Sequence, residues 1–371
     1  MRFSRAAVSF FLWSAQHHSQ PVRAFATAAA PFSSAITSGR KKKQECPAFV
    51  TPFRGGALYS QQQQSTSQKS MSTTSSTALH SAVATSEAET TPVEYFRKDY
   101  QPLPFTVDTV NLEFDIYPGK TTVTAEMKLV QNPNCNTSND QPLELDGDET
   151  AVKLISIQLD GQELKPHTDY TLSPGKLILL KPTDGGILTT TVEIVPEDNT
   201  QLSGLYKSGP MYCTQCEAQG FRRITYFPDR PDNMSTYARV TLKAPKDEYP
   251  VLLSNGNLVE QGTLEDNNTR HYAVWSDPFP KPSYLFAAVA GNLASIHDSY
   301  TTASGQDVQL AIFSEKESVD KLQYAMDSLK RSMKWDEDRF GLEYDLGIYN
   351  IVATSDFNMG AMENKVRTMK L

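Results

Sequence analysis

The chain has 371 residues, of which 39% are hydrophobic and 10% aromatic, so it can bury at least one substantial core and has room for more than one domain. Its formal net charge is −8, but residues 1–86 hold nine basic residues and one acidic residue, which leaves a net charge of −16 on the remainder. An acidic body argues against nucleic acid as a partner and suits a ligand with a positively charged end, although most of these carboxylates are expected to form a solvated surface.

Residues 1–92 are expected to form a targeting leader and a disordered, low-complexity segment, and they are left out of the expected fold. An apolar run at 6–15 follows two arginines, as in a signal peptide, and is too short to span a bilayer. The following Arg23-Ala24-Phe25-Ala26-Thr27 resembles the junction in the bipartite leaders of algae with complex plastids. We therefore predict a plastid location, with the mitochondrion or the cytoplasm as alternatives, and no membrane span in the mature body.

From about Val93 the sequence alternates apolar and polar residues in short segments separated by turns. The alternation at 110–116 and again at 123–129, with Pro118-Gly119 between them, predicts a β-hairpin. A second hairpin is predicted where residues 154–159 meet Asp160-Gly161, because this dipeptide favours a two-residue turn. Further strands are expected at 177–181, 187–195, 238–244, 251–253, 271–275 and 284–290. Strands at this spacing indicate an antiparallel all-β domain over residues 93–290.

After about Gly291 the pattern changes to a mixture of helix and strand. A helix is predicted to begin after a Ser318 cap, and strands are expected at 308–313 and 348–353. The apolar stripe of the helix, which is typical of core packing, consists of Leu322, Met326, Leu329 and Met333. These elements open a mixed α and β region.

The four cysteines do not make a disulfide framework, and only Cys213 and Cys216 form a C-x-x-C pair. A structural zinc site would need a second ligand pair at similar spacing, which the sequence lacks. A redox motif would need a strand before it and a helix after it, whereas Gln219-Gly220 follows almost at once. Neither function is favoured for this pair.

Residues 359–364, after the last expected strand, carry the candidate binding chemistry. Gly360 has no side chain, so another backbone can approach closely there. Met359 and Met362 offer adaptable apolar surface, and Glu363 places a carboxylate where it can bind an ammonium group. A strand end closed by a turn is the alternative, and local chemistry alone does not decide between the two.

The motif Gly360-Ala361-Met362-Glu363-Asn364 resembles the exopeptidase motif of the aminopeptidase N family of zinc metallopeptidases. Further stretches that resemble the bacterial and organellar alanyl aminopeptidase branch of that family are Cys-Thr-Gln-Cys-Glu-Ala at 213–218, Phe-Pro-Asp-Arg-Pro-Asp at 227–232, Asp-Pro-Phe-Pro-Lys-Pro at 277–282, Ser-Met-Lys-Trp-Asp-Glu at 332–337 and Phe-Gly-Leu-Glu-Tyr-Asp at 340–345. The similarity covers roughly residues 93–365 in order, so the chain is identified as the N-terminal portion of a family member, ending just after the motif.

This resemblance implies a mainly β fold: an antiparallel β-sandwich or saddle domain at 93–290, then the incomplete beginning of a thermolysin-like α+β catalytic domain at 291–371. It implies peptide substrates with a free N-terminus, whose backbone pairs with the motif strand. It also places a Gln-x-Glu loop over the active site, with glutamates that pair with the α-ammonium group and exclude internal segments. The substrate-binding residues expected on this basis are Gln215, Glu217, Met359, Gly360, Ala361, Met362, Glu363 and Asn364.

In the family, hydrolysis also needs Zn²⁺, held by His-Glu-x-x-His and a later glutamate, together with a tyrosine. The sequence has six histidines, none of which begins that motif: His17, His18, His80, His167, His271 and His297. We therefore expect no metal ligands, no complete catalytic set and no activity from these residues alone. The chain is expected to be truncated before the zinc motif. After Lys365 it departs from the family pattern, which fits a gene-model error, an intron read into the frame or a truncated product.

Three functions follow from these observations. The leading one is the N-terminal part of a zinc-dependent aminopeptidase that releases N-terminal amino acids from peptides, with a broad preference for alanine and for larger basic or apolar first residues. The second is a non-catalytic peptide-binding module derived from that family. The third is the family's epoxide-hydrolase relatives, against which Ala361 in the motif argues.

Overall fold

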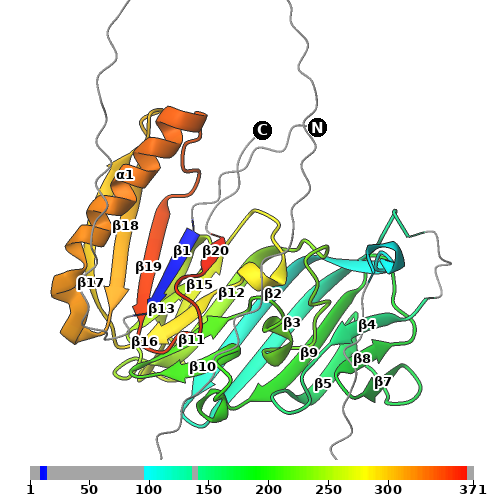
Figure 1. Ribbon diagram of the computed structural model, residues 1–371. Coiled ribbons are helices and arrows are strands. Elements are labelled where there is room, and N and C mark those ends of the chain that lie inside the picture. Colours follow the sequence, from blue (N-terminus) through cyan, green and yellow to red (C-terminus); the bar gives the residue numbers. More distant parts are fainter. Residues whose placement is uncertain (1–8, 15–95, 136–140, 366–371) are drawn as a thin grey trace, which may run out of the picture. The chain divides into compact units, whose positions relative to one another are not determined.

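An eight-stranded sheet forms the largest part of the fold, with the strand order β14-β15-β12-β2-β3-β9-β5-β6 (Figure 1). The computed structural model describes residues 9–14, 96–135 and 141–365, all of which belong to one compact unit. The strands of this sheet are β2 (Phe105–Tyr117), β3 (Lys120–Gln131), β5 (Lys153–Leu159), β6 (Gln162–Glu163), β9 (Ile187–Ile194), β12 (Thr236–Pro245), β14 (Asn257–Thr263) and β15 (Arg270–Ser276).

Both predicted hairpins are confirmed. Tyr117 pairs with Lys120 across the first turn, and Leu159 pairs with Gln162 across the second. The two residues of the second turn, Asp160 and Gly161, both have positive φ, at 52° and 77°. Two successive residues of this kind match the right-handed twist of the flanking strands, which explains the preference for Asp-Gly here.

The expected antiparallel pairing holds for most neighbours, but β2 and β12 run parallel, from Thr109 opposite Thr236 to Asp115 opposite Lys243. More than a hundred residues separate these two strands in sequence, so no hairpin connection forces them to be antiparallel. The sheet is therefore mixed at this one junction.

One face of the large sheet forms the core, because alternate residues along each strand point to the same side. Val110, Leu112 and Phe114 of β2 are at most 2% exposed. Aromatic rings fill the space beyond them: Phe114 stacks on Phe286, whose ring also contacts Tyr237 at 5.4 Å between centroids. Residues from distant parts of the chain thus share one apolar interior.

Two smaller sheets pack beside the large one. A three-stranded sheet has the order β4-β8-β7, and a four-stranded sheet has the order β10-β11-β16-β13. Their strands are β4 (Leu143–Asp146), β7 (Tyr170–Ser173), β8 (Lys176–Leu179), β10 (Gly204–Ser208), β11 (Met211–Gln215), β13 (Val251–Ser254) and β16 (Ala288–Gly291). Short 3₁₀ helices lie between strands: η1 (Arg97–Asp99), η2 (Pro196–Asp198), η3 (Phe221–Arg223) and η4 (Ser283–Leu285).

The prediction of one strand at 284–290 is wrong. The 3₁₀ helix η4 occupies the first part of this range, and only the part that belongs to β16 forms a strand. Phe286 donates its backbone N–H to the Ser283 carbonyl, which closes the 3₁₀ turn. The Ser283 hydroxyl also donates to Asp229, at 2.6 Å. Local and side-chain hydrogen bonds thus replace the ladder bonds that a strand would have made there.

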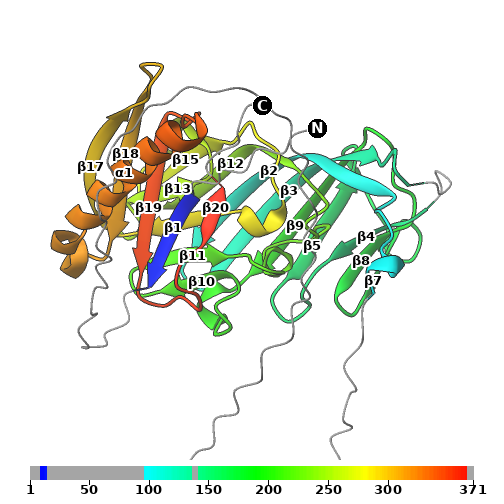
Figure 2. The ribbon, with the colours of Figure 1, turned by 45° about the horizontal axis from the view of Figure 1, so that its top comes forward.

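The C-terminal region contains a five-stranded sheet with the order β17-β18-β19-β1-β20 and one long helix on its face (Figure 2). Its elements are β1 (Ser9–Ser14), β17 (Ala294–Thr301), β18 (Asp307–Ser314), η5 (Lys316–Lys321), α1 (Gln323–Phe340), β19 (Ile348–Thr354) and β20 (Glu363–Lys365). β1 comes from the segment that the sequence analysis left out of the fold; the rest of that leader lies outside the described residues, so its proposed extent stays a prediction.

The predicted apolar stripe of α1 is confirmed, since Met326, Leu329 and Met333 are at most 5% exposed. The predicted Ser318 cap is wrong. Ser318 lies inside η5, where its N–H donates to the Glu315 carbonyl, so the chain is already helical before α1 begins. A helix N-cap must itself be non-helical. Within the described residues, no helix combines the length and the apolar character needed to cross a membrane.

Candidate functional site

The predicted Gln-x-Glu loop is a tight turn at the end of the β10–β11 hairpin. Gln215 is the last residue of β11 and pairs with Gly204 of β10. The next residues turn back at once, because the Gly220 N–H donates to the Cys216 carbonyl at 2.8 Å. A Cβ on Gly220 would lie 2.4 Å from the Gln215 carbonyl oxygen, so glycine is required for this closure. Glu217 lies in the turn and is exposed.

The Gln215 side chain is buried without a hydrogen-bond partner. The residue is 1% exposed, and neither its amide nitrogen nor its amide oxygen is bonded within the described part of the chain. A buried primary amide can donate two hydrogen bonds and accept two, so leaving it unpaired costs free energy. The Gln215 amide therefore has hydrogen-bonding capacity that the described residues do not use.

The segment that leads to the motif is fixed to the β10–β11 hairpin by side-chain hydrogen bonds. Tyr206 of β10 donates its hydroxyl to the Asp356 carbonyl at 2.9 Å. Ser208, also in β10, lies 3.0 Å from the Thr354 hydroxyl and 3.0 Å from the Asp356 carboxylate. Residues about 150 apart in sequence are thus joined, and the motif follows directly from this attachment.

These attachment residues were not among the sequence-based candidates. Tyr206, Ser208 and Asp356 carry no motif, and their separation in the chain leaves no local pattern that could link them. Their partners become evident only in the folded structure. They act by positioning, since they hold the motif segment against the hairpin that carries Gln215.

Across residues 359–364, exposed and buried residues follow one another in a way the sequence did not reveal. Met359 is 55% exposed, and a Cβ on Gly360 would meet no atom within 4 Å, so this side of the segment is open. Met362, by contrast, is 1% exposed and belongs to the hydrophobic core, while Ala361 is half-buried. In the ligand-free chain, therefore, Met359 offers accessible apolar surface and Met362 anchors the segment.

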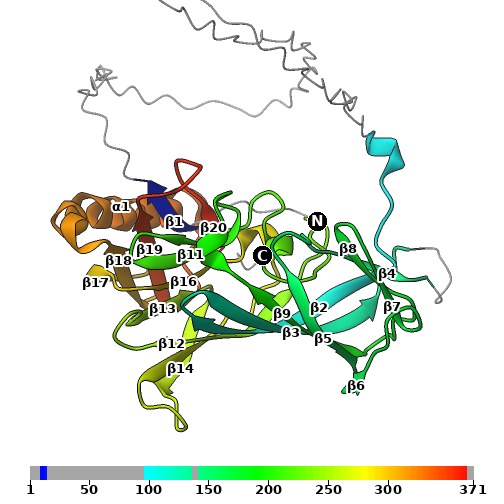
Figure 3. The same cartoon turned by 90° about the horizontal axis from the view of Figure 1, so that it is seen from below.

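The last two motif residues lie in β20 and differ in burial. Glu363 is exposed, and no ion pair to it occurs among the described residues. Asn364 is 1% exposed, and both atoms of its amide lack hydrogen-bond partners in the described structure. β20 lies against η4 and on the same side of the fold as β11 (Figure 3). The two predicted segments each combine one exposed carboxylate with one buried, unpaired amide.

The buried carboxylate of Asp229 is hydrogen-bonded to the segment that follows the Gln-x-Glu turn. Asp229 accepts hydrogen bonds from the backbone N–H and the Nε of Arg222, at 3.2 and 3.0 Å, and from the Ser283 hydroxyl. Burial raises the pKa of Asp229, although the bonds from Ser283 and Arg222 oppose that shift. Because Arg222 follows Gly220 by two residues and Ser283 begins η4, Asp229 connects both structures that border the site.

A second buried network lies in the 277–282 stretch. The Lys281 ammonium group lies 3.0 Å from the Asp277 carboxylate, and both side chains have no exposed surface. The same ammonium lies 4.1 Å from the centroid of the Tyr237 ring. The backbones of Ser235 and Lys281 exchange two hydrogen bonds at 2.9 and 3.0 Å. The Lys281–Asp277 pair is internal, and its groups are all engaged within the fold.

The C-x-x-C pair is not poised for redox or metal chemistry. Cys213 and Cys216 are both fully buried free thiols. Burial raises the pKa of Cys213 to about 12, and it raises the pKa of Cys216 well above its ordinary value. Reactive and metal-binding cysteines need the thiolate form, which these surroundings disfavour.

In the described part of the chain, the donor groups that zinc would require are not assembled. Among the described residues no group of three or more histidine, cysteine, aspartate or glutamate side chains lies together. Of the histidines in this part, His271 bonds to the Tyr249 carbonyl and His297 to the Ser295 hydroxyl. The residues present do not fit a zinc ion.

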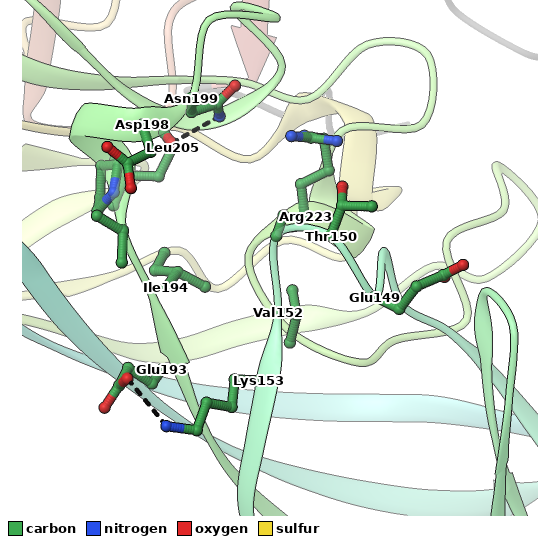
Figure 4. A pocket seen from close by; sticks show the side chains of 13 residues that line it. Glu149, Thr150, Val152, Lys153, Glu193, Ile194, Asp198, Asn199, Leu205 and Arg223 are labelled. Atoms are coloured by element: carbon green, nitrogen blue, oxygen red, sulfur yellow. Dashed lines mark hydrogen bonds and ion pairs between the residues drawn. The ribbon is translucent and has the colours of Figure 1, made fainter.

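A cavity of about 250 Å³ lies on the β domain (Figure 4). Three of its charged groups are already paired: Arg223 with Asp148, and Glu193 with Lys153 at 3.4 Å. None of the predicted substrate-binding residues lines it. This pocket therefore belongs to the mixed-charge surface of the domain.

Comparisons with known proteins cover both regions. The family model described as the peptidase M1 N-terminal domain matches residues 98–285, and that of the peptidase family M1 domain matches residues 324–370. The chain is 49% identical to aminopeptidase N of Caulobacter vibrioides over 275 residues, which is 74% of this chain and 31% of the relative. It is 47% identical to aminopeptidase N of Escherichia coli over 276 residues, 74% of this chain and 30% of the relative.

A solved structure is similar as well. The crystal structure of Legionella pneumophila aminopeptidase A in complex with aspartic acid matches with a TM-score of 0.65 and 35% sequence identity, over 71% of this chain and 30% of that chain. The chain thus spans about 30% of the length of the relatives it matches.

Proposed function

Because the chain belongs to the peptidase M1 family, as an N-terminal portion of an aminopeptidase N, we propose that it supplies the site that holds the α-ammonium group of a peptide substrate. The observation that carries this proposal is the pairing of two exposed glutamates, Glu217 and Glu363, with two buried amides that have no partners in the described structure, Gln215 and Asn364. A peptide N-terminus offers the groups that such a set lacks.

An ammonium group has three N–H donors. Two carboxylates and an amide oxygen can accept charge-assisted hydrogen bonds from them. The amide nitrogens remain as donors for a peptide carbonyl. An internal peptide segment has no ammonium group to bind the two glutamates, and the residues that precede it would need space beside them. Such a segment is therefore excluded. Specificity for the first residue follows from the chemistry of the chain end.

The substrate backbone would add to the sheet at β20. This strand is the last of the five in the order of its sheet, so one of its edges is unpaired in the described structure. An extended peptide can form main-chain hydrogen bonds to such an edge. The open space beside Gly360 lets that backbone come close, and the exposed Met359 offers an adaptable surface to different side chains, in keeping with a broad preference for alanine and larger basic or apolar first residues.

Zinc-dependent hydrolysis is a property of the M1 family that the residues of this chain do not provide. The sequence contains no His-Glu-x-x-His motif, and the described residues hold no ligand cluster. The residues here would bind and orient the substrate, and no step of bond cleavage is assigned to them. For the purified chain we expect no stoichiometric zinc by metal analysis and no hydrolysis of an aminoacyl reporter; about one zinc per chain with chelator-sensitive hydrolysis would contradict this.

A non-catalytic peptide-binding module is the second candidate, and the same unpaired amides favour it. Both candidates require recognition of a free N-terminus, so binding is the test. Tri-alanine with a free N-terminus should bind to the chain in a calorimetric titration, and N-acetyl tri-alanine should not. Binding should weaken above about pH 8, where the peptide amine loses its proton. Equal affinity for the two peptides would overturn the proposal.

The matched control for this titration is Glu163→Gln. Glu163 is an exposed glutamate in β6, an edge strand of the large sheet. It lies in neither motif segment. Its neutralisation alters net charge as much as a change at Glu217 does. Affinity for the free peptide should therefore be retained in Glu163→Gln and lost in part in Glu217→Gln.

We further propose that the leader directs the protein to a plastid. The basic, acid-poor composition of residues 1–86 and the Arg23-Ala24-Phe25 junction support this address. A fluorescent fusion of residues 1–92 should enter plastids in cells of an alga with complex plastids. Accumulation in mitochondria or in the cytoplasm would decide for one of the alternatives.

A further inference from the structure

The loop at 199–203 leads into β10 and lies against the Gln-x-Glu turn. Gly204, the first residue of β10, pairs with the last residue of β11. A Cβ on Gly204 would lie 2.7 Å from the Arg223 Cβ and 3.1 Å from the Gly220 carbonyl oxygen, so the loop and the turn touch with no room for a side chain. A shift of this loop would therefore displace the turn that carries Glu217.

Leu202, within this loop, has a backbone conformation that large apolar residues seldom adopt. Its φ is 52°, in the left-handed region, where the side chain of an L-residue crowds its own backbone. The other two non-glycine residues with positive φ in the described structure, Asp160 and His167, are polar and lie in turns. A conformation of this kind persists only where the surrounding contacts determine it, and it is characteristic of functional sites.

Side-chain hydrogen bonds on both sides of Leu202 hold the loop in place. Asn199 donates its amide nitrogen to the Ser203 and Leu205 carbonyls, at 2.7 and 2.9 Å (Figure 4). Arg223, which follows the Gln-x-Glu turn, donates its Nε to the same Ser203 carbonyl at 3.1 Å. The Leu202 side chain itself packs against the hydrophobic core. The loop is thus fixed to the structure around the turn.

The Leu202 carbonyl meets the residue that precedes the motif. It accepts a hydrogen bond from the side-chain amide nitrogen of Asn358, at 3.3 Å. Asn358 is followed directly by Met359, and Glu363 comes five positions later. Through this bond the segment that carries Glu363 is linked to the loop that packs on the turn of Glu217.

We propose that Asn358 is a positioning residue of the ammonium site, and that the left-handed conformation of Leu202 serves to direct its carbonyl to Asn358. The bond between them helps to set the separation of Glu217 and Glu363. Two carboxylates can hold one ammonium group together only at a separation that suits its N–H directions. The inference rests on the proposed function, because it assigns to this pair the task of matching the two glutamates to one ligand.

The conformation of Leu202 is tested by two substitutions. Glycine adopts a positive φ readily, whereas valine, which branches at Cβ, does not. Leu202→Gly should therefore keep the carbonyl in place, and its Kd for tri-alanine in the calorimetric titration should stay within about twofold of the wild type. Leu202→Val should displace the carbonyl and raise Kd by about two- to tenfold, as expected for the loss of one hydrogen bond. Valine keeps more of the apolar packing than glycine does, so a role in packing alone predicts the opposite order, and that order would overturn the proposal.

The Asn358 side chain is tested by removing its amide. Asn358→Ala should raise Kd by about two- to tenfold. The matched control, Asn111→Ala, removes another solvent-exposed amide bond, to Glu126 at 3.2 Å, and should leave Kd unchanged. In a Glu217→Gln background, Asn358→Ala should have a smaller effect, because the separation of two carboxylates no longer matters once one is neutral. Full additivity of the two changes would contradict the proposal.

Hydrogen exchange on the peptide-free chain distinguishes failure of this inference from failure of the proposed function. Asn358→Ala and Leu202→Val should each increase exchange in residues 355–362, whereas Leu202→Gly and Asn111→Ala should not. Exchange in β2 and β3 should stay constant in all four variants, which excludes a general loss of stability. Unchanged exchange in 355–362 for both Asn358→Ala and Leu202→Val would overturn the link and leave the proposed function standing. If the wild type binds no peptide, the proposed function fails, and exchange still reports whether this bond joins the two segments.

Discussion

Two polar turns of similar size, the one at 277–281 and the one at 215–220, differ in whether their polar groups are satisfied. In the first, the buried ammonium of Lys281 lies 3.0 Å from the Asp277 carboxylate, over the Tyr237 ring. In the second, the equally buried Gln215 amide has no partner in the described structure, and Glu217 extends into solvent. Both stretches resemble the same family, yet only the second has unused hydrogen-bonding capacity.

This difference separates residues that stabilise the fold around the site from residues that have hydrogen bonds to offer a ligand. A buried polar group with all its bonds made specifies the fold and has nothing to offer a ligand. A buried polar group without partners costs stability in the free protein, and that cost is recovered only when a ligand supplies the missing bonds. Satisfaction of hydrogen bonds therefore distinguishes these two turns better than their sequence similarity does.

The largest expected effect is on the satisfied turn. Lys281→Met removes the ammonium but keeps the length of the side chain, and it leaves the Asp277 carboxylate buried and unpaired. Breaking a buried ion pair in this way should lower the free energy of unfolding by about 3–5 kcal/mol, measured by urea denaturation. The control Lys334→Met breaks the exposed pair with Asp338 and should cause no measurable change. Equal stability of the two variants would show that the buried pair is not structural.

At the turn at 215–220, a substitution should change the free energy of unfolding in the opposite direction. Gln215→Met replaces the buried amide by an apolar side chain of nearly the same shape, which removes two unpaired groups. The free energy of unfolding should rise by about 1–3 kcal/mol, while affinity for a free N-terminal peptide should fall. A loss of stability in Gln215→Met would mean that the amide has a partner in solution, and the contrast between the two turns would then fail.

A smaller effect is expected where the motif segment is attached to β10. Tyr206→Phe removes the hydroxyl that donates to the Asp356 carbonyl and should lower the free energy of unfolding by about 0.5–1.5 kcal/mol. Exchange protection in residues 355–362 should decrease at the same time. Tyr272→Phe, which loses an exposed bond to Glu260, is the matched control and should leave this segment unchanged. If both variants behave alike, Tyr206 does not position the motif.

The smallest effect is a slope in the dependence of stability on pH. Burial lowers the pKa of Lys281 below its ordinary value of 10.5, and the nearby Asp277 carboxylate only partly opposes this. Between the folded-state pKa and 10.5 the unfolded chain binds this proton and the folded chain does not, so the contribution of Lys281 to the unfolding free energy increases as pH rises through that window. The wild type should therefore show a more positive alkaline slope than Lys281→Met. Parallel curves up to pH 10.5 would contradict the lowered pKa.

Much of the fold could be predicted from the sequence because its signals are local. The alternation of Val110, Leu112 and Phe114 defines the buried face of a strand, and Asp160-Gly161 favours a two-residue turn. Neither signal depends on distant parts of the chain. The start of α1 and the strand at 284–290 were predicted wrongly, because bonds that Ser283 makes to Asp229 and that Ser318 makes within η5 are decided by the folded chain. The parallel pairing of β2 with β12 depends likewise on strands far apart in sequence.

For the candidate site, sequence identified the residue types but not their environments. Glu217 and Glu363 are exposed, as a group that meets a charged ligand should be. Nothing in the sequence distinguished the exposed Met359 from the buried Met362, or indicated that the amides of Gln215 and Asn364 are enclosed without partners. Burial is a property of the assembled sheets and of the attachment at Tyr206 and Ser208.

The central claim, that the two motif segments together hold a peptide's α-ammonium group, is tested most directly by calorimetric titration of the chain with free tri-alanine. Glu363→Gln and Glu217→Gln each remove one charge-assisted hydrogen bond while keeping side-chain shape, so each should raise Kd by about ten- to hundredfold, corresponding to roughly 1.5–3 kcal/mol. The double variant should bind more weakly than either, without full additivity, because both groups contact the same ammonium. If both glutamine variants bind the peptide as tightly as Glu163→Gln does, these glutamates do not hold the substrate's N-terminus.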